Sequence, residues 1–251
     1  MNILVINGSP KKKGGASAFL SKVLRFMLFP KKVIYKTLGF SRNFESIFEM
    51  LQNTDLVVFS VPLYVDGIPS HMLDFLKKLE EFCINKKCKF KLYVISNSGF
   101  VGGKQNHAHL EQYKCWCERS GITWGGGLGI GGGVMLHVIF YLIFLLSIAQ
   151  LAAGIIFNVA FGHPITDNQL LYGFVRGMII WAFLCSGLLF CELRLAWAIR
   201  MKRCIKNMYT RVMVPSFVFL LFASAFMALG ALFNGKLFSL NKRGDYSKYL
   251  K

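Results

Sequence analysis

The chain has 251 residues, of which 54% are hydrophobic, and its formal net charge is +18. A sequence pI of about 9.8 would ordinarily favour a nucleic-acid partner. The charge is divided evenly, however, with 18 Lys/Arg against 9 Asp/Glu in residues 1–133 and 12 against 3 in residues 134–251. In the second part the basic residues flank apolar runs, where they mark a cytoplasmic membrane face. We therefore expect a lipid bilayer as partner and no nucleic acid.

The composition changes at residue 133. Hydrophobic and charged residues are mixed before it, as in a soluble domain large enough for its own core, and three long apolar stretches follow it. We predict a soluble domain over 1–133 and a membrane region over 134–251. The first apolar run, ILVI, is short and no cleavage site follows it, so we expect no signal peptide. The seven cysteines show no metal-ligand spacing, which predicts reduced thiols and no metal site.

In the first region, short apolar runs alternate with segments of helical periodicity. Strands are expected at 2–7, 31–38, 55–64, 89–99 and 122–129, and helices at 15–28, 43–53, 69–83 and 104–121. This alternation predicts an α/β fold with a five-stranded, doubly wound parallel sheet and right-handed crossovers. Ligands of such sheets bind beyond the carboxyl ends of the strands.

Three unusual loops leave these strand ends. The first, NGSPKKKGGAS (7–17), has glycines that let backbone N–H groups approach an anion at a helix N-terminus. It matches neither a Walker loop nor GxGxxG, and an ordinary turn with solvated lysines explains it equally well. The second, PLYVDGIPS (62–70), presents a tyrosine that can lie against a flat ring, or simply an exposed turn. The third, SNSGFVGG (96–103), has small and amide side chains able to bond the edge of a heterocycle. Taken in chain order, the three loops describe a site for flavin mononucleotide (FMN).

Residues 1–133 resemble the flavodoxin-like fold, specifically the NADPH-dependent FMN reductases among the NAD(P)H-dependent flavin oxidoreductases. The resemblance rests on NILVINGSPKKKGGAS, DLVVFSVPLYVDGIPSHMLDFLKKL and WCERSGITWGGGLGIGGG. It implies a strand order of 2-1-3-4-5, FMN as cofactor, NAD(P)H as co-substrate and a homodimer formed over the cofactor. It also implies the FMN-binding residues, which are Ser9, Lys11, Gly15, Ala16 and Ser17 in the first loop, Pro62, Leu63, Tyr64, Val65, Asp66 and Gly67 in the second, and Asn97, Ser98, Gly99 and Phe100 in the third.

The chain departs from this family in two places. Many relatives have Asn or a similar polar residue where this chain has Ala16, so one phosphate contact is missing. The span 38–54 contains no cysteine, which disfavours an iron–sulfur centre. Because the chemistry would belong to the flavin, no side chain is predicted to be catalytic. We interpret His71, His107 and His109 as surface or helix-capping residues.

Three apolar segments in the second region reach the length of about 20 residues that a bilayer requires. They are 134–161, 172–193 and 212–233. The connector 162–169 has no Lys or Arg and 194–211 carries six, which predicts a cytoplasmic side for the latter and for the soluble domain. The basic tail after 234 conflicts with three spans, which would place it outside. Either the third segment is re-entrant or interfacial, or the tail overrides the charge rule.

Two functions from different classes fit these features. The first is a membrane-anchored, FMN-dependent NAD(P)H oxidoreductase at the cell membrane. It would pass electrons from a nicotinamide to a quinone or another small-molecule acceptor of the lipid phase, and this acceptor is inferred from location alone. The second is a non-catalytic membrane protein whose flavodoxin-like domain carries electrons or binds partners. The alanine at position 16 and the short second-strand region favour this alternative.

Overall fold

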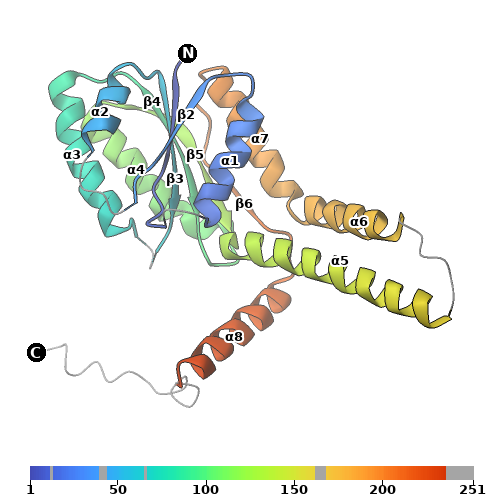
Figure 1. Ribbon diagram of the computed structural model, residues 1–251. Helices are drawn as coiled ribbons and strands as arrows, with labels where there is room; N and C mark the ends of the chain where they lie inside the picture. Colours follow the sequence, from blue (N-terminus) through green and yellow to red (C-terminus); the bar gives the residue numbers. More distant parts are fainter. Residues whose placement is uncertain (12–13, 40–43, 65–66, 162–167, 236–251) are drawn as a thin grey trace, which may run out of the picture. The chain divides into compact units, whose positions relative to one another are not determined.

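The computed structural model describes residues 1–11, 14–39, 44–64, 67–161 and 168–235. The chain divides into two compact units, Met1–Met213 and Val214–Lys251. In the larger unit, helices cover both faces of one sheet (Figure 1). In the smaller unit the described secondary structure is a single apolar helix, α8 (Ser216–Phe233).

The sheet contains six parallel strands in the order β2-β1-β3-β4-β5-β6. The strands are β1 (Ile3–Asn7), β2 (Val33–Thr37), β3 (Leu56–Pro62), β4 (Lys91–Asn97), β5 (Thr123–Gly131) and β6 (Met208–Arg211). Every residue of β1 and β3 is buried, as expected for strands covered on both faces. The first five strands follow the order 2-1-3-4-5 of the flavodoxin-like fold. The predicted α/β class and doubly wound parallel sheet are therefore confirmed.

The prediction of five strands is wrong, because β6 pairs with β5 as a sixth parallel strand. Its sequence, MYTR, is short and lies in a basic connector, so it lacks the apolar pattern of a strand. Glycine makes the approach to β5 possible. A Cβ on Gly126 would lie 2.6 Å from the carbonyl oxygen of Ile205, just before β6. The pairing thus depends on the lack of a side chain at this point of β5, and the sequence of β6 alone does not predict it.

Two groups of helices cover the sheet (Figure 1). On one face lie α2 (Glu45–Gln52), α3 (Ser70–Lys86) and α4 (His107–Ser120), the last preceded by the short 3-10 helix η1 (Gly103–Asn106). On the other face α1 (Ala16–Leu28) lies beside α7 (Ser186–Arg200). The Tyr93 hydroxyl of β4 donates to the Arg203 carbonyl oxygen at 2.8 Å, which fastens the end of α7 to the sheet. Both α7 and β6, although they follow residue 133, are thus part of the α/β layers.

Between β5 and α7 the chain forms two neighbouring apolar helices, α5 (Gly133–Phe161) and α6 (Asn168–Leu184) (Figure 1). Small residues allow their close approach, since a Cβ on Gly177 would lie 2.6 Å from Cγ2 of Ile143. The Arg176 guanidinium also donates to Oε1 of Gln150 at 3.2 Å. We call this helix pair, residues 133–184, the α5–α6 hairpin.

By length and composition, two helices of the described residues can cross a membrane, Tyr141–Phe161 and Ser216–Phe233. The expected span at 172–193 is not one straight helix. Tyr172–Leu184 and Ser186–Arg200 are bent by 66° and form a third crossing only if they count together. The sequence conceals the bend because both halves are apolar, although one apolar stripe of the second half is buried in the α/β layers. The tail after 235 and most of the connector 162–169 lie outside the described residues.

Candidate functional site

Twelve of the fifteen predicted cofactor-binding residues line one open cleft at the carboxyl ends of β1, β3 and β4. The cleft has a volume of about 730 Å³ and is lined by Ser9, Lys11, Gly15, Ala16, Ser17, Pro62, Leu63, Tyr64, Asn97, Ser98, Gly99, Phe100 and Tyr141. This volume is typical of small-molecule sites. Gly67 does not line the cleft, but it exchanges two backbone hydrogen bonds with Tyr64, at 3.1 and 3.3 Å. Val65 and Asp66 lie outside the described residues.

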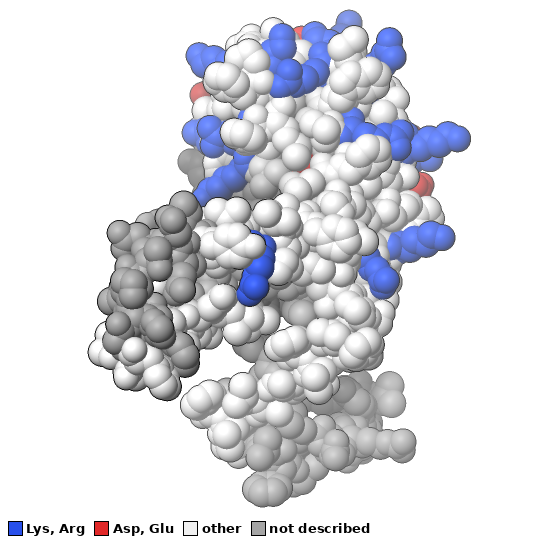
Figure 2. All heavy atoms as spheres, turned by 90° about the vertical axis from the view of Figure 1, so that its right-hand side faces the viewer, with Lys and Arg blue, Asp and Glu red and all other residues white. Residues whose placement is uncertain are grey.

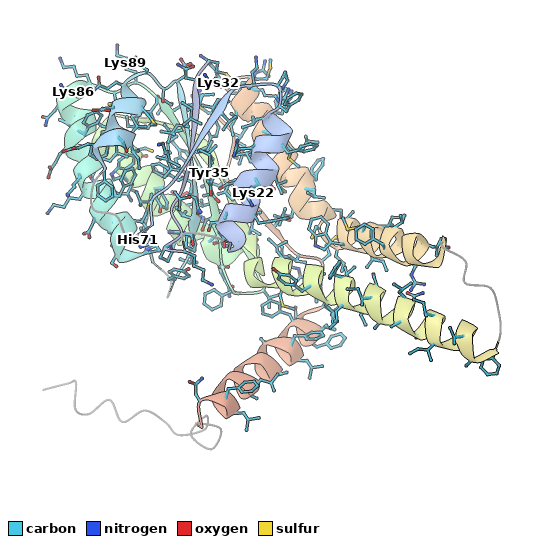
Figure 3. All side chains as sticks on the ribbon, viewed as in Figure 1. Lys22, Lys32, Tyr35, His71, Lys86 and Lys89 are labelled. Carbon is cyan, nitrogen blue, oxygen red and sulfur yellow. The ribbon has the colours of Figure 1, made fainter. Side chains whose placement is uncertain are left out.

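The first loop turns tightly and then opens into a helix. The Asn7 side chain accepts from the Ser9 N–H at 3.1 Å, and the His71 ring contacts the Gly8 carbonyl oxygen at 2.8 Å (Figure 3). Gly15 has a φ of 88°, a conformation that favours glycine. Helix α1 then begins at Ala16 with no side-chain cap and no acidic residue in its first turn. Its N-terminal N–H groups and positive dipole end therefore meet the cleft, which is an arrangement suited to an anion.

Buried side chains fix the start of α1 on the sheet. The Asn97 amide donates to the Ser17 hydroxyl at 2.8 Å and to the Val61 carbonyl oxygen at 3.0 Å. The Ser60 hydroxyl donates to the backbone oxygen of Ser17 at 2.8 Å. Because the Ser17 oxygen accepts from Asn97, its own proton can be donated to a group in the cleft. The first and third loops are thus joined by a direct hydrogen bond between Asn97 and Ser17.

Exposed aromatic side chains form the other part of the cleft. Tyr64, Phe100 and Tyr141 all line it, and each is well exposed to solvent. Aromatic faces of this kind suit a planar ring. Tyr141 is absent from the predicted set because its sequence neighbourhood, VIFYLIFLL, belongs to the apolar run assigned to the membrane. Its position depends on α5 starting where β5 ends, close to the third loop, which is a tertiary relationship.

A buried polar network supports the third loop from behind. The Asn106 amide donates to the Ser98 hydroxyl at 3.3 Å and to the Ile130 carbonyl oxygen at 3.2 Å. The Ser96 hydroxyl lies 2.7 Å both from Oδ1 of Asn106 and from Nδ1 of His109. The network holds Ser98 in place without itself lining the cleft.

The interpretation of His109 as a surface or capping residue is wrong, because its side chain is fully buried. Desolvation by this burial lowers the pKa of the imidazole to about 4, so the ring is neutral at pH 7. His107 differs, since it is exposed and its ring contacts the Tyr209 hydroxyl at 2.8 Å. Among the described residues, no group of three or more His, Cys, Asp or Glu side chains could hold a metal ion.

A second hollow, of about 610 Å³, lies at the opposite end of the sheet, where Asn2 precedes β1 and Asp55 precedes β3. Lysines line part of it, including Lys86 and Lys89 (Figure 3). It is remote from the carboxyl ends of the strands, where ligands of this fold class bind. The first cleft is therefore the stronger candidate site.

No protein-family model and no curated protein matches the chain. Solved structures with some similarity include the Trp repressor binding protein from Bacillus subtilis, with 18% identity, a TM-score of 0.44, and coverage of 52% of this chain and 84% of that one. An NADPH-quinone reductase from P. pentosaceus has 10% identity and a TM-score of 0.45, and the match covers 73% of this chain and 97% of that one. An FMN-dependent NADH-azoreductase from Bacillus anthracis, in complex with FMN, has 13% identity and a TM-score of 0.37, and the match covers 52% of this chain and 87% of that one. All three TM-scores are below 0.5. These proteins assign no family to the chain, and the flavodoxin-like fold follows from its strand order.

Proposed function

We propose that the chain is a membrane-anchored, FMN-dependent NAD(P)H oxidoreductase. The observation that carries this proposal is the convergence of three loops, distant in sequence, on one cleft. The cleft combines an uncapped helix N-terminus, buried amide and hydroxyl groups, and exposed aromatic rings. These are the three kinds of group that a phosphate, a polar ring edge and a flat ring face require.

The residues of the cleft fit the parts of FMN in kind. Ser9, Lys11, Gly15, Ala16 and Ser17 would hold the phosphate, with Gly15 supplying backbone that a side chain would strain. Tyr64 and Phe100 would flank the ring, and Asn97, Ser98 and Gly99 would meet its edge. When bound there, FMN would supply the redox chemistry, which is acceptance of a hydride from NAD(P)H and onward transfer of electrons. The side chains of the cleft would bind and orient the group.

The membrane anchor is part of the same proposal. The segment Tyr141–Phe161 has a mean hydropathy of 2.2, and 0% of it is buried. Such a surface is costly in water and favourable in a bilayer, so a lipid partner would stabilise it. The six Lys and Arg residues of 194–211 support a cytoplasmic position for the α/β unit at the cell membrane.

Tyr141 supports an acceptor from the lipid phase. It lines the cleft and is also the first residue of the apolar segment Tyr141–Phe161. If that segment crosses the bilayer, the cleft lies next to the membrane surface. A quinone could then reach the flavin without leaving the lipid, which favours the quinone class over a soluble acceptor.

The test is to purify the full chain in mild detergent and record its visible absorbance before and after anaerobic addition of NADPH. We expect an oxidised-flavin spectrum that NADPH bleaches and a soluble quinone analogue restores. A yellow protein that NADPH does not bleach would favour an electron carrier. A colourless protein that added FMN cannot restore would reject the flavin site.

A further inference from the structure

Helix α7 has apolar stripes on two faces. One stripe, which includes Leu188, Leu195 and Ile199, is buried in the α/β layers. The other consists of Phe190, Leu193, Trp197 and Met201, spaced by three or four residues and exposed by 61, 54, 53 and 51% respectively. A surface helix ordinarily turns a polar face outward. The second stripe of α7 therefore indicates a partner outside the α/β layers.

The neighbouring end of α1 extends this apolar surface. Phe26 and Phe29 are 84 and 75% exposed. The two helices are tied together, because the Arg200 guanidinium donates to the carbonyl oxygens of Met27 and Phe29. Between them lies an open, largely apolar groove of about 520 Å³, lined by Met27, Leu193, Arg194, Ala196, Trp197 and Arg200.

The surface around these side chains is positively charged. Lys22 and Arg25 project from α1, and Arg194 is exposed on α7. The Arg203 guanidinium lies 5.4 Å from the centre of the Trp197 ring. Helix α1 contains no acidic residue, and Glu192, the single acid of α7, is fully buried. On this side of the molecule, Lys and Arg far outnumber Asp and Glu (Figure 2).

We propose that this α1/α7 face docks on the surface of a bilayer containing anionic lipid. The face consists of Phe26, Phe29, Phe190, Leu193, Trp197 and Met201 with the cations Lys22, Arg25, Arg194 and Arg203. Exposed aromatic and aliphatic side chains enter the headgroup region, and the cations attract the lipid phosphates. A second copy of the chain fits less well, since self-association would bring like charges together.

The bend between α6 and α7 agrees with this orientation. The two helices meet at 66°. If α6 lies along the bilayer normal, α7 is therefore nearer to the membrane plane than to the normal. The inference goes beyond the proposed function and requires neither the flavin nor NAD(P)H.

The test measures the contact of Trp197 with lipid in the full chain. The protein is placed in nanodiscs that contain phosphatidylcholine with brominated acyl chains, with or without phosphatidylglycerol. The contribution of Trp197 to the emission is the difference between the wild type and Trp197→Phe. We expect the bromines to quench this contribution in the anionic discs and to quench it less in the neutral ones.

Charge reversal supplies the matched comparison. The combined Lys22→Glu, Arg25→Glu and Arg194→Glu change should lower the ratio of docked to undocked protein by at least about 100-fold, since each lost cation costs roughly fivefold and the new carboxylates add repulsion. Lys77→Glu, Lys86→Glu and Lys89→Glu change the net charge equally. These three control residues belong to α3 and the loop after it, on the other face of the sheet. Figure 3 shows Lys86 and Lys89 far from Lys22 of the α1/α7 face. We expect this control to leave the quenching unchanged.

Unquenched Trp197 in anionic discs, or equal effects of the two triple variants, would overturn the proposal. Chain dimers that the first triple variant dissociates, with Trp197 unquenched, would overturn it in favour of self-association. Flavin absorbance is read on the same samples. Quenched Trp197 in a colourless protein would support docking and count against the flavin proposal. A yellow protein with unquenched Trp197 would support the flavin proposal and overturn docking.

Discussion

Replacing Ala16 with Asp should separate the stability of the fold from the affinity for FMN. Ala16 is the first residue of α1, whose first turn contains no acid. A carboxylate at this position interacts favourably with the helix dipole and should raise the free energy of unfolding by about 0.3–1 kcal/mol. The same carboxylate would face the phosphate of FMN, because Ala16 lines the cleft.

The repulsion follows from Coulomb's law. Two unit charges about 4 Å apart interact with about 1 kcal/mol in water and about 4 kcal/mol at an effective dielectric of 20. A phosphate carries nearly two charges, and the cleft is open to water, so we expect a loss of about 2–4 kcal/mol. Since 1.4 kcal/mol corresponds to a tenfold change, FMN should bind roughly 30- to 700-fold more weakly.

Ala16→Asn is the matched control, because the side chain of Asn has nearly the same size as that of Asp and carries no charge. Its amide adds a donor at the place where this chain lacks one. A typical hydrogen bond is worth about 0.5–1.5 kcal/mol, so binding should tighten by roughly 2- to 10-fold. Both affinities are measured by titrating the detergent-purified apoprotein with FMN, and both stabilities by thermal unfolding without FMN. Wild-type affinity in a folded Ala16→Asp protein would refute our placement of the phosphate.

Three further changes test other parts of the structure. Tyr141→Ala should weaken FMN binding about 2- to 10-fold through loss of an aromatic contact, whereas Tyr141→Phe should leave the affinity unchanged. An unchanged affinity in the Ala variant would show that Tyr141 of α5 does not contact FMN. Gly177→Leu should lower the melting temperature in detergent at a cost of about 1–3 kcal/mol, because its Cβ would lie 2.6 Å from Ile143. Gly230→Leu is its control, since a Cβ there meets nothing within 4 Å, and equal melting temperatures would contradict close helix packing. Burial lowers the pKa of His109 from its ordinary value of 6.5 to about 4. The stability that comes from its neutral form is therefore fully present above pH 6.5 and is lost as the pH falls toward 4. Between pH 7 and pH 5 this loss should be about 2 kcal/mol. Urea unfolding should show a smaller pH dependence for His109→Gln, and an unchanged pH dependence would argue against a buried neutral imidazole.

The predictable part of the site follows from sheet geometry. In a doubly wound sheet the loops after β1, β3 and β4 meet at one edge, so short apolar runs followed by polar loops are enough to bring Ser17 and Asn97 together. The burial of His109 could also be predicted from the sequence pattern. Tyr113 and Trp116 follow it at helical spacing and are buried with it, which marks the inner face of α4.

The rest depends on contacts between distant segments. Helix α7 continues the apolar composition of α6, and only its packing beside α1 distinguishes a helix of the α/β layers from a continued span. Strand β6 has no apolar pattern and depends on the glycines of β5. Tyr141 joins the cleft only because α5 starts where β5 ends. Periodicity in one segment contains none of this information.

The position of the α5–α6 hairpin affects how the protein is made. Synthesis produces β1 to β5 first, then the hairpin, and α7 and β6 only afterwards. Until that last segment is synthesised, the Tyr93 hydroxyl lacks its acceptor, the Arg203 carbonyl oxygen, and the part of the sheet that α7 covers beside α1 stays exposed. If the hairpin enters a bilayer, as we propose, its insertion can begin before the α/β unit closes, and a chain that fails to insert would expose both the apolar hairpin and the unfinished sheet to chaperones and proteases.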